Sequence, residues 1–141
     1  MKTLWFKPYT LADWDSRYPD TLVEHLGIKI TEIGDDFIRG TMPVDGRTHQ
    51  PQGLLHGGAS VVLAETLGSI AANMVIDSNS YVAVGQEINA NHIRGIKSGI
   101  VTGTARAFYI GRTSQVWGIE IQNPNGQLVC VSRITMAVRA L

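Results

Sequence analysis

The sequence predicts an α+β protein in which one long helix covers one face of a curved antiparallel β-sheet. Residues 59–77 are small and apolar without strict alternation, over a length typical of a helix. Segments rich in Val, Ile and Thr lie on both sides and are separated by turn residues. A helix packed on an antiparallel sheet accounts for this order of elements. The length of 141 residues suits one domain, so we expect a single domain over residues 1–141.

The first predicted elements are short helices. Residues 10–27 contain the signals for one or two of them. Thr10 is a suitable cap, Pro19 suits a first helical turn, and Gly27 is a suitable stop.

The remaining elements are predicted to be strands, two before the long helix and four after it. A polar loop over residues 45–53 joins the second strand to the helix, because Pro51 and Gly53 favour irregular backbone. The links between the last four strands are short, which favours an antiparallel meander. The predicted strands cover residues 28–33, 37–43, 81–93, 99–110, 113–122 and 127–139.

The composition excludes several classes of protein. Twelve basic and twelve acidic residues give a formal net charge of zero, so nucleic acid is not an expected partner. A neutral surface suits association, and the second face of the sheet needs a cover, so we expect a dimer or larger oligomer. The single Cys130 indicates a reducing compartment. The sequence shows neither a membrane span nor a secretory signal, so a cytoplasmic location is expected.

Glu65 stands out because it is the only charged residue between Gly57 and Ile76, which cover nearly all of the predicted helix. Ser69 and Asn73 follow at four-residue spacing, so the three residues form a narrow polar stripe on an apolar helix. The small residues Gly68 and Ala72 lie close to the stripe and would allow a backbone or a ligand to approach. One interpretation is a solvent-exposed edge, and the other is a functional carboxylate.

The motif His56-Gly57-Gly58 at the start of the helix favours the functional interpretation. Glycines leave the first helical N–H groups open, and a helix N-terminus can stabilise an oxyanion. The alternative is a helix entry with a capping histidine. With the amide of Gln50, these groups and Glu65 are what acyl transfer to water requires. Partial burial would raise the basicity of Glu65.

Other chemistries fit the sequence less well. The four histidines lack metal-ligand spacing, so no metal site is expected. Ser60 is not part of a nucleophile elbow, and no glycine-rich phosphate loop is present. Cys130 lies in a strand pattern, which favours a core residue over a nucleophile.

Four segments of the chain closely resemble the hotdog-fold acyl-CoA thioesterases. These are PVDGRTHQPQGLLHGGASVVLAETLGS, VAVGQEINANHIR, GRTSQVWGIEI and SRIT. The closest subgroup includes the 1,4-dihydroxy-2-naphthoyl-CoA hydrolases of menaquinone synthesis and the proofreading thioesterases of enterobactin synthesis. The resemblance covers almost the whole chain. It implies a hotdog fold, with the sheet wrapped around the helix, and a homodimer that assembles to a tetramer with active sites at the dimer interface.

The resemblance also assigns roles to residues. Glu65 matches the catalytic carboxylate of the family. Gln50 and His56 match the amide and the histidine that support this carboxylate, and the Gly57 N–H matches the oxyanion donor. Ser69 matches a residue that positions the attacking water or the acyl group, and Gly85 lines the acyl site. Coenzyme A is part of the substrate, and no separate cofactor is implied. The residues that match coenzyme A contacts are His92, Ile93, Arg94, Gly95, Tyr109, Gly111, Arg112 and Ser114, of which Arg112 departs from the smaller residue expected there.

The implied function is hydrolysis of an aryl- or acyl-CoA thioester, and three alternatives remain. The acyl group can be held by a carrier protein instead of coenzyme A. A hotdog dehydratase needs the histidine as base and a more distant acid, whereas His56 and Glu65 are nine residues apart. A non-catalytic acyl-CoA binding module does not need these side chains. The sequence does not identify the acyl group. Candidates for the wall of its pocket are Trp5, Trp14, Phe37 and Tyr81.

Overall fold

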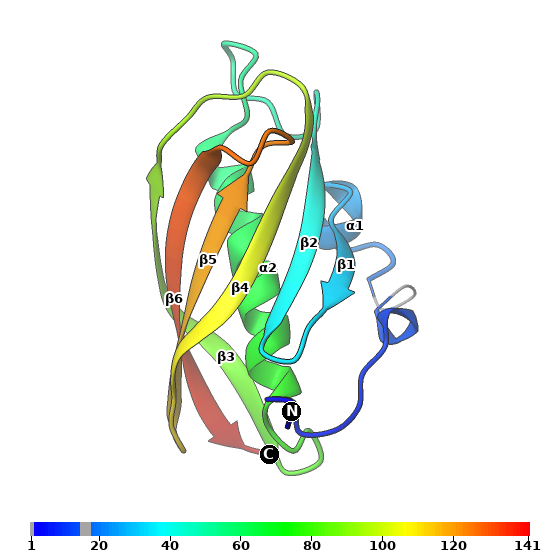
Figure 1. Cartoon of the computed structure of the whole chain (residues 1–141), viewed down its shortest axis with the longest axis vertical. Coiled ribbons are helices and arrows are strands. Elements are labelled where there is room, and N and C mark those ends of the chain that lie inside the picture. Colours follow the sequence, from blue (N-terminus) through cyan, green and yellow to red (C-terminus); the bar gives the residue numbers. More distant parts are fainter. Residues whose placement is uncertain (1, 15–17) are drawn as a thin grey trace.

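The computed structural model of the chain describes residues 2–14 and 18–141. Within these residues, six strands form one antiparallel sheet in the order β1-β2-β4-β5-β6-β3, and the long helix α2 lies on one face of it (Figure 1). The predicted α+β class is confirmed. The elements are η1 (Leu11–Asp13), α1 (Leu22–His25), β1 (Lys29–Ile33), β2 (Phe37–Val44), α2 (Gly57–Met74), β3 (Tyr81–His92), β4 (Gly99–Ile110), β5 (Ser114–Gln122) and β6 (Leu128–Ala140).

The two short N-terminal helices agree with the sequence except at Pro19. Thr10 is the N-cap of η1, and Gly27 follows the end of α1 with a φ of 71°, a conformation that favours glycine. Pro19 does not begin a helix, because Asp20 after it has a φ of 59°, which is incompatible with a right-handed helical turn. Residues 15–17 of the predicted helical segment lie outside the described residues.

The strand order differs from the predicted meander at β3. Strands β4, β5 and β6 do form a meander, but β3 pairs with β6 and not with β4. Three strand spacings therefore separate β3 from β4, a width of about 14 Å. Residues 93–98 can span about 20 Å, and they cross the end of the sheet (Figure 1). Their path is fixed where the N–H groups of Ile93 and Arg94 donate to the carbonyl of Val129.

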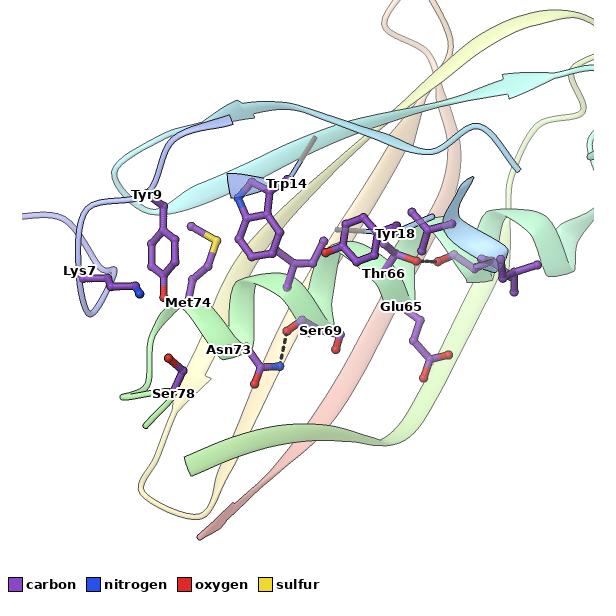
Figure 2. A pocket seen from close by; sticks show the side chains of 14 residues that line it. Lys7, Tyr9, Trp14, Tyr18, Glu65, Thr66, Ser69, Asn73, Met74 and Ser78 are labelled. Carbon is purple, nitrogen blue, oxygen red and sulfur yellow. Dashed lines mark hydrogen bonds between the residues drawn. The ribbon is translucent and has the colours of Figure 1, made fainter. Parts of the chain in front are cut away.

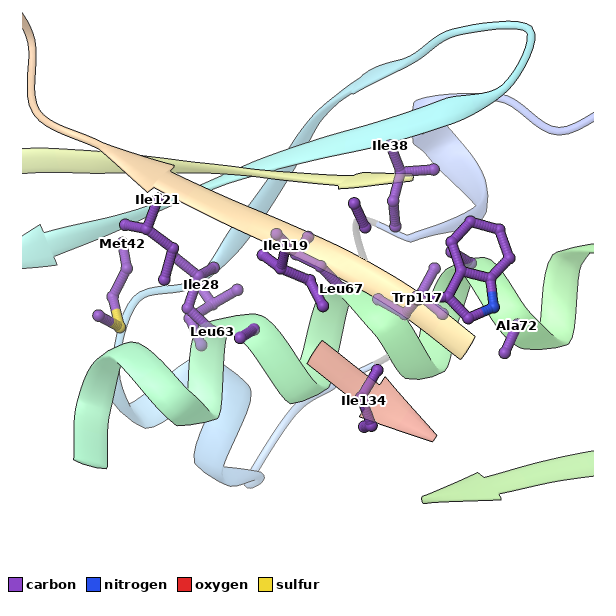
Figure 3. Packing of buried hydrophobic residues seen from close by; sticks show 14 of the residues in the cluster. Ile28, Ile38, Met42, Leu63, Leu67, Ala72, Trp117, Ile119, Ile121 and Ile134 are labelled. Atoms are coloured by element: carbon purple, nitrogen blue, oxygen red, sulfur yellow. The ribbon is translucent and has the colours of Figure 1, made fainter. Parts of the chain in front are cut away.

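Glycines allow α2 and the sheet to approach closely. Gly40 of β2 and Gly103 of β4 are register partners, and a Cβ on either would stand 2.8 or 2.7 Å from a methyl group of Leu67. On the helix, a Cβ on Gly68 would stand 2.6 Å from Cγ2 of Ile134. Gly68 therefore faces the sheet. Of the two partners that the sequence allowed, a backbone or a ligand, the structure shows close approach of the sheet. Figure 3 shows Leu67 and Ile134 among the packed side chains.

Buried polar groups attach the last turn of α2 to the sheet. The indole N–H of Trp117 donates to Oε1 of Gln115 over 2.7 Å, and Nε2 of Gln115 donates to the carbonyl of Ala72 over 3.3 Å. Gln115 thus satisfies a carbonyl near the helix C-terminus. The ring of Trp5 stacks on Trp117 with centroids 6.4 Å apart, which brings the N-terminal segment into the core.

Cys130 is fully buried in β6, so the prediction of a core residue is confirmed. Burial raises the pKa of its thiol above the ordinary value, which disfavours a nucleophilic thiolate. Among the described residues, no helix is both long and apolar enough to cross a bilayer.

Candidate active site

The start of α2 is capped by His56. Nδ1 of its imidazole accepts a hydrogen bond from the Gly58 N–H over 2.8 Å, and the backbone N–H of His56 donates to the carbonyl of Thr48 over 2.7 Å. The capping role, which was the structural alternative in the sequence, is therefore present. The Gly57 N–H occupies the first helical position and has no acceptor within the helix, so it is available to an oxyanion.

The loop before the helix is fixed by its own hydrogen bonds. Thr48 is buried, and its hydroxyl donates to the carbonyl of Pro43 over 2.9 Å. Hydrogen bonds from Arg47 lower the pKa of Asp45 to about 2, so this turn carries a charge pair at neutral pH. The Gln50 N–H donates to Leu54, and its side-chain oxygen accepts from a backbone N–H within the loop. Among the described residues, the amide nitrogen of Gln50 has no hydrogen-bond acceptor.

His92 reaches the helix start from the end of β3. A Cβ on Gly57 would stand 2.6 Å from Nε2 of His92, so the close approach of this ring requires glycine. A cavity of about 270 Å³ opens here. Its lining includes the predicted residues Gln50, Gly57, His92, Ile93, Arg94 and Gly95.

Glu65 and Ser69 lie in a second, larger cavity of about 700 Å³. Figure 2 shows Glu65, Ser69 and Asn73 along one side of α2, which confirms that these residues share a face. Glu65 points away from the aromatic side chains in this view. Its side chain is exposed, so the partial burial expected from the sequence is not provided by the single chain.

Gly85 of β3 lies directly against the carboxylate of Glu65. A Cβ on Gly85 would stand 2.8 Å from Oε1 of Glu65 and 3.9 Å from its Cδ. A β-bulge follows, since Gly85 pairs with Met136 and Glu87 pairs with Thr135. The bulge changes the direction of the strand beside the carboxylate.

The two cavities are too far apart for one acyl group to use both within one chain. Gly57 and Glu65 are eight residues apart on the same helix, a rise of about 12 Å. A reacting carbonyl must lie about 3 Å from both the oxyanion donor and the attacking group. His56, Gly57 and Glu65 stand close together in the sequence motif, but the helix separates Glu65 from the other two in space.

The two groups of predicted coenzyme A contacts are separated as well. Ser114 lies level with Val84 across β6, at the beginning of β3, whereas His92 lies at its end. Eight strand residues between these levels correspond to about 26 Å. The turn after β4, with the Gly111 N–H donating to the Ser114 carbonyl over 2.8 Å, is therefore distant from the His92 cavity. The members of this distant group are Tyr109, Gly111, Arg112 and Ser114.

Aromatic residues of the N-terminal segment form a wall that the sequence identified only in part. Trp14, one of the four candidates, lines the Glu65 cavity, together with Tyr9 and Tyr18 (Figure 2). Trp5 and Trp14 both belong to the core cluster, but Trp5 does not line this cavity. Spacing of four to five residues between Tyr9, Trp14 and Tyr18 was the signal available in the sequence.

The family follows from comparison with known proteins. The Thioesterase superfamily model matches residues 52–130, which include the start of α2, Glu65 and β3. The chain therefore belongs to the thioesterase superfamily and is a thioester hydrolase.

Individual relatives are similar over almost their whole length. The chain is 48% identical to the proofreading thioesterase EntH of Cronobacter turicensis, over 96% of this chain and 98% of that protein. It is 46% identical to the 1,4-dihydroxy-2-naphthoyl-CoA hydrolase of Escherichia coli, over the same shares. Thioesterase HI1161 of Haemophilus influenzae has a TM-score of 0.95 at 47% identity, over 99% of this chain and 96% of that one. The predicted hotdog fold is thus confirmed.

Proposed function

We propose that the enzyme hydrolyses an aryl- or acyl-CoA thioester to the free acid and coenzyme A, with Glu65 as the catalytic carboxylate. The observation that carries the proposal is the position of Glu65. It is the only charged side chain of α2, and it lies in a large cavity against the backbone of Gly85. A carboxylate with an open approach on one side can reach a carbonyl carbon or a water molecule.

Two routes give the same products. As a nucleophile, Glu65 attacks the thioester carbonyl and expels the thiolate, and water then hydrolyses the mixed anhydride. As a general base, Glu65 takes a proton from water, hydroxide adds to the carbonyl, and the proton passes to the thiolate as the C–S bond breaks. Both routes consume one water and release one acid and one thiol.

The oxyanion donor that the resemblance implies, the Gly57 N–H, lies too far from Glu65 within one chain. Because about 12 Å of helix separates Gly57 from Glu65, we propose that each active site combines Glu65 of one chain with Gly57 and Gln50 of a second chain. Two antiparallel copies of α2 related by a two-fold axis near residue 61 would place Gly57 opposite Glu65. Closure by the second chain would also provide the burial that Glu65 lacks.

The same pairing would join the two groups of coenzyme A contacts. His92 to Gly95 lie beside Gly57, and the turn from Tyr109 to Ser114 lies about 26 Å away. We infer that the two groups come from different chains and contact one coenzyme A molecule where those chains meet. Arg94 and Arg112 are exposed and supply positive charge for its phosphates.

The aromatic wall favours a planar acyl group. Tyr9, Trp14 and Tyr18 line the cavity that contains Glu65 and Ser69, and aromatic rings pack well against an aryl substrate. A relative named for a naphthoyl-CoA substrate makes 1,4-dihydroxy-2-naphthoyl-CoA a suitable first test compound. The same assay with acyl carrier protein thioesters decides which thiol carrier is preferred.

The decisive experiment is thiol release by Glu65→Gln, which keeps the side-chain shape and removes nucleophilicity and basicity. We expect turnover of benzoyl-CoA and 1,4-dihydroxy-2-naphthoyl-CoA to fall at least ~10²-fold with an unchanged melting curve. His56→Ala should cost less, since the role proposed for His56 is to orient and polarise and not to form or break a covalent bond. The control is Glu32→Gln in β1, which makes the same change on an exposed edge strand. A folded Glu65→Gln enzyme with near-normal turnover would refute the mechanism.

The proposed assembly is a homodimer that forms a tetramer. Two surfaces are available for dimer and tetramer formation. One is the exposed edge of β3, and the other is the outer face of the sheet, where Phe108 is 73% exposed. Light scattering at micromolar concentration should give a tetrameric mass, and a monomeric mass would contradict both the assembly and the shared active site.

A further inference from the structure

Asn73, two turns after Glu65 on α2, is bonded to the backbone of β3 in a way that none of the roles above explains. Its Oδ1 accepts from the Ala83 N–H over 2.9 Å, and its Nδ2 donates to the Ala83 carbonyl over 3.0 Å. Nδ2 also donates to the carbonyl of Ser69 over 2.8 Å. We call these three hydrogen bonds the Asn73 clamp.

The clamp replaces a strand at one point of the sheet edge. β3 pairs with β6 on one side only, so the backbone groups of Ala83 on the other side would face solvent or the helix. The primary amide of Asn73 offers one acceptor and two donors, and it satisfies both groups of Ala83 as a neighbouring strand would. It does so from the last turn of α2, which is itself attached to β5 through Gln115. The helix therefore fixes the position of β3 at Ala83, near the start of the strand.

The position of Ala83 determines where Gly85 lies. Ala83 and Gly85 are two positions apart, about 7 Å along the strand, so their Cβ positions lie on the same side of the sheet. Gly85 is the residue against which the Glu65 carboxylate rests, with only 2.8 Å from Oε1 to an ideal Cβ. A small movement of β3 would therefore change the space available to the carboxylate.

We propose that Asn73 is a positioning residue, which holds β3 against α2 through Ala83 and thereby sets the orientation of the Glu65 carboxylate relative to Gly85. This inference rests on the proposed role of Glu65. Asn73 acts through the strand and makes no bond to reacting atoms. Because misplacement of a reacting group by about 1 Å can cost ~10²-fold in rate, loss of the clamp should lower kcat and leave KM nearly unchanged.

The test is a double-mutant cycle with Asn73→Ala and Glu65→Gln, measured by thiol release from benzoyl-CoA. Asn73→Ala should lower kcat about tenfold or more while changing KM less than about twofold. In the Glu65→Gln background it should change the residual rate less than about twofold, because residues that act as a unit are not additive. Asn73→Asp keeps the acceptor but sets a carboxylate against two carbonyl oxygens, so it should be no more active than Asn73→Ala.

The matched control is Asn123→Ala in the turn between β5 and β6. Asn123 also makes three side-chain hydrogen bonds, to the N–H groups of Asn125 and Gln127 and to the Gln127 side chain. Its loss should leave kcat within about twofold. Equal losses in the control and in Asn73→Ala, or full additivity in the cycle, would overturn the proposal.

A second readout does not depend on catalysis. Hydrogen exchange of the Ala83 amide should accelerate in Asn73→Ala, because its acceptor is removed, while the amides in the middle of α2 keep their protection. Unchanged exchange at Ala83 would also overturn the clamp. If no thioester were hydrolysed at all, the proposed function would fail, while this measurement would still decide whether Asn73 holds β3 through Ala83.

Discussion

The two faces of α2 differ in what they contact and in what a substitution on each should change. The face on the sheet is formed by buried residues such as Leu63, Leu67 and Gly68. The other face carries Glu65, which is exposed, and Asn73, which is half-buried and bonded to β3. Both faces belong to one helix of 18 residues. Its apolar composition is therefore a requirement of packing on one side, and the polar stripe lies on the side that the sheet leaves uncovered.

The largest expected effect is on the sheet face. Leu67→Ala removes the side chain that fills the space over Gly40 and Gly103, so we expect a loss of about 2–5 kcal/mol in the free energy of unfolding. Urea unfolding followed by fluorescence measures it. Thr66→Ala, one residue away on the open face, should change stability by less than about 1 kcal/mol. Equal losses would mean that the two faces do not differ in their contribution to folding.

A smaller effect, on rate and not on stability, is expected from Gly85→Ala. The new methyl group would stand 2.8 Å from Oε1 of Glu65, and a flexible carboxylate moves at little cost in folding. We expect kcat to fall about tenfold with a melting temperature close to the original. Gly46→Ala is the control, since its Cβ would meet nothing within 4 Å. Unchanged turnover in Gly85→Ala would show that the position of the carboxylate is not critical.

The fold was largely predictable because its signals are local. β4 has the predicted bounds, and α2 begins two residues before the predicted start, at Gly57 instead of Ala59. Glycine is a poor helix former, but here His56 caps the first turn. The place of β3 was not predictable in this way. Pairing with β6 joins residues that are distant in the sequence, and the short link to β4 gave the opposite indication.

The candidate site was predictable as a set of residues but not as an arrangement. Glu65, Ser69 and Asn73 share a face, as four-residue spacing requires. The separation of Gly57 from Glu65 also follows from helical rise. It was overlooked because the two residues stand close together in the sequence. The contact between Gly85 and Glu65 depends on tertiary packing of β3, which single-sequence patterns do not contain.

The smallest expected effect concerns the binding of coenzyme A beside the N-terminus of α2. Arg94 lies in the cavity beside Gly57, and no ion pair among the described residues includes Arg94 or Arg112. Their guanidinium groups are thus available to phosphates of coenzyme A, which lie far from the reacting carbon. Because such contacts bind substrate and transition state equally, Arg94→Ala should raise KM about fivefold and leave kcat within about twofold. Added salt should raise KM for the original enzyme more than for the variant, since screening weakens the same contact.

Arg112→Ala tests the distant turn in the same assay. If a second chain brings that turn to the same coenzyme A molecule, KM should rise there too, and the rise should be absent with a short thioester that lacks the nucleotide. Lys29→Ala, which removes an exposed positive charge in the edge strand β1, is the control and should leave KM unchanged. A rise for Arg94→Ala alone would confine coenzyme A binding to the helix start. Unchanged KM in both variants would make these arginines solvated surface charges and remove them from the binding site.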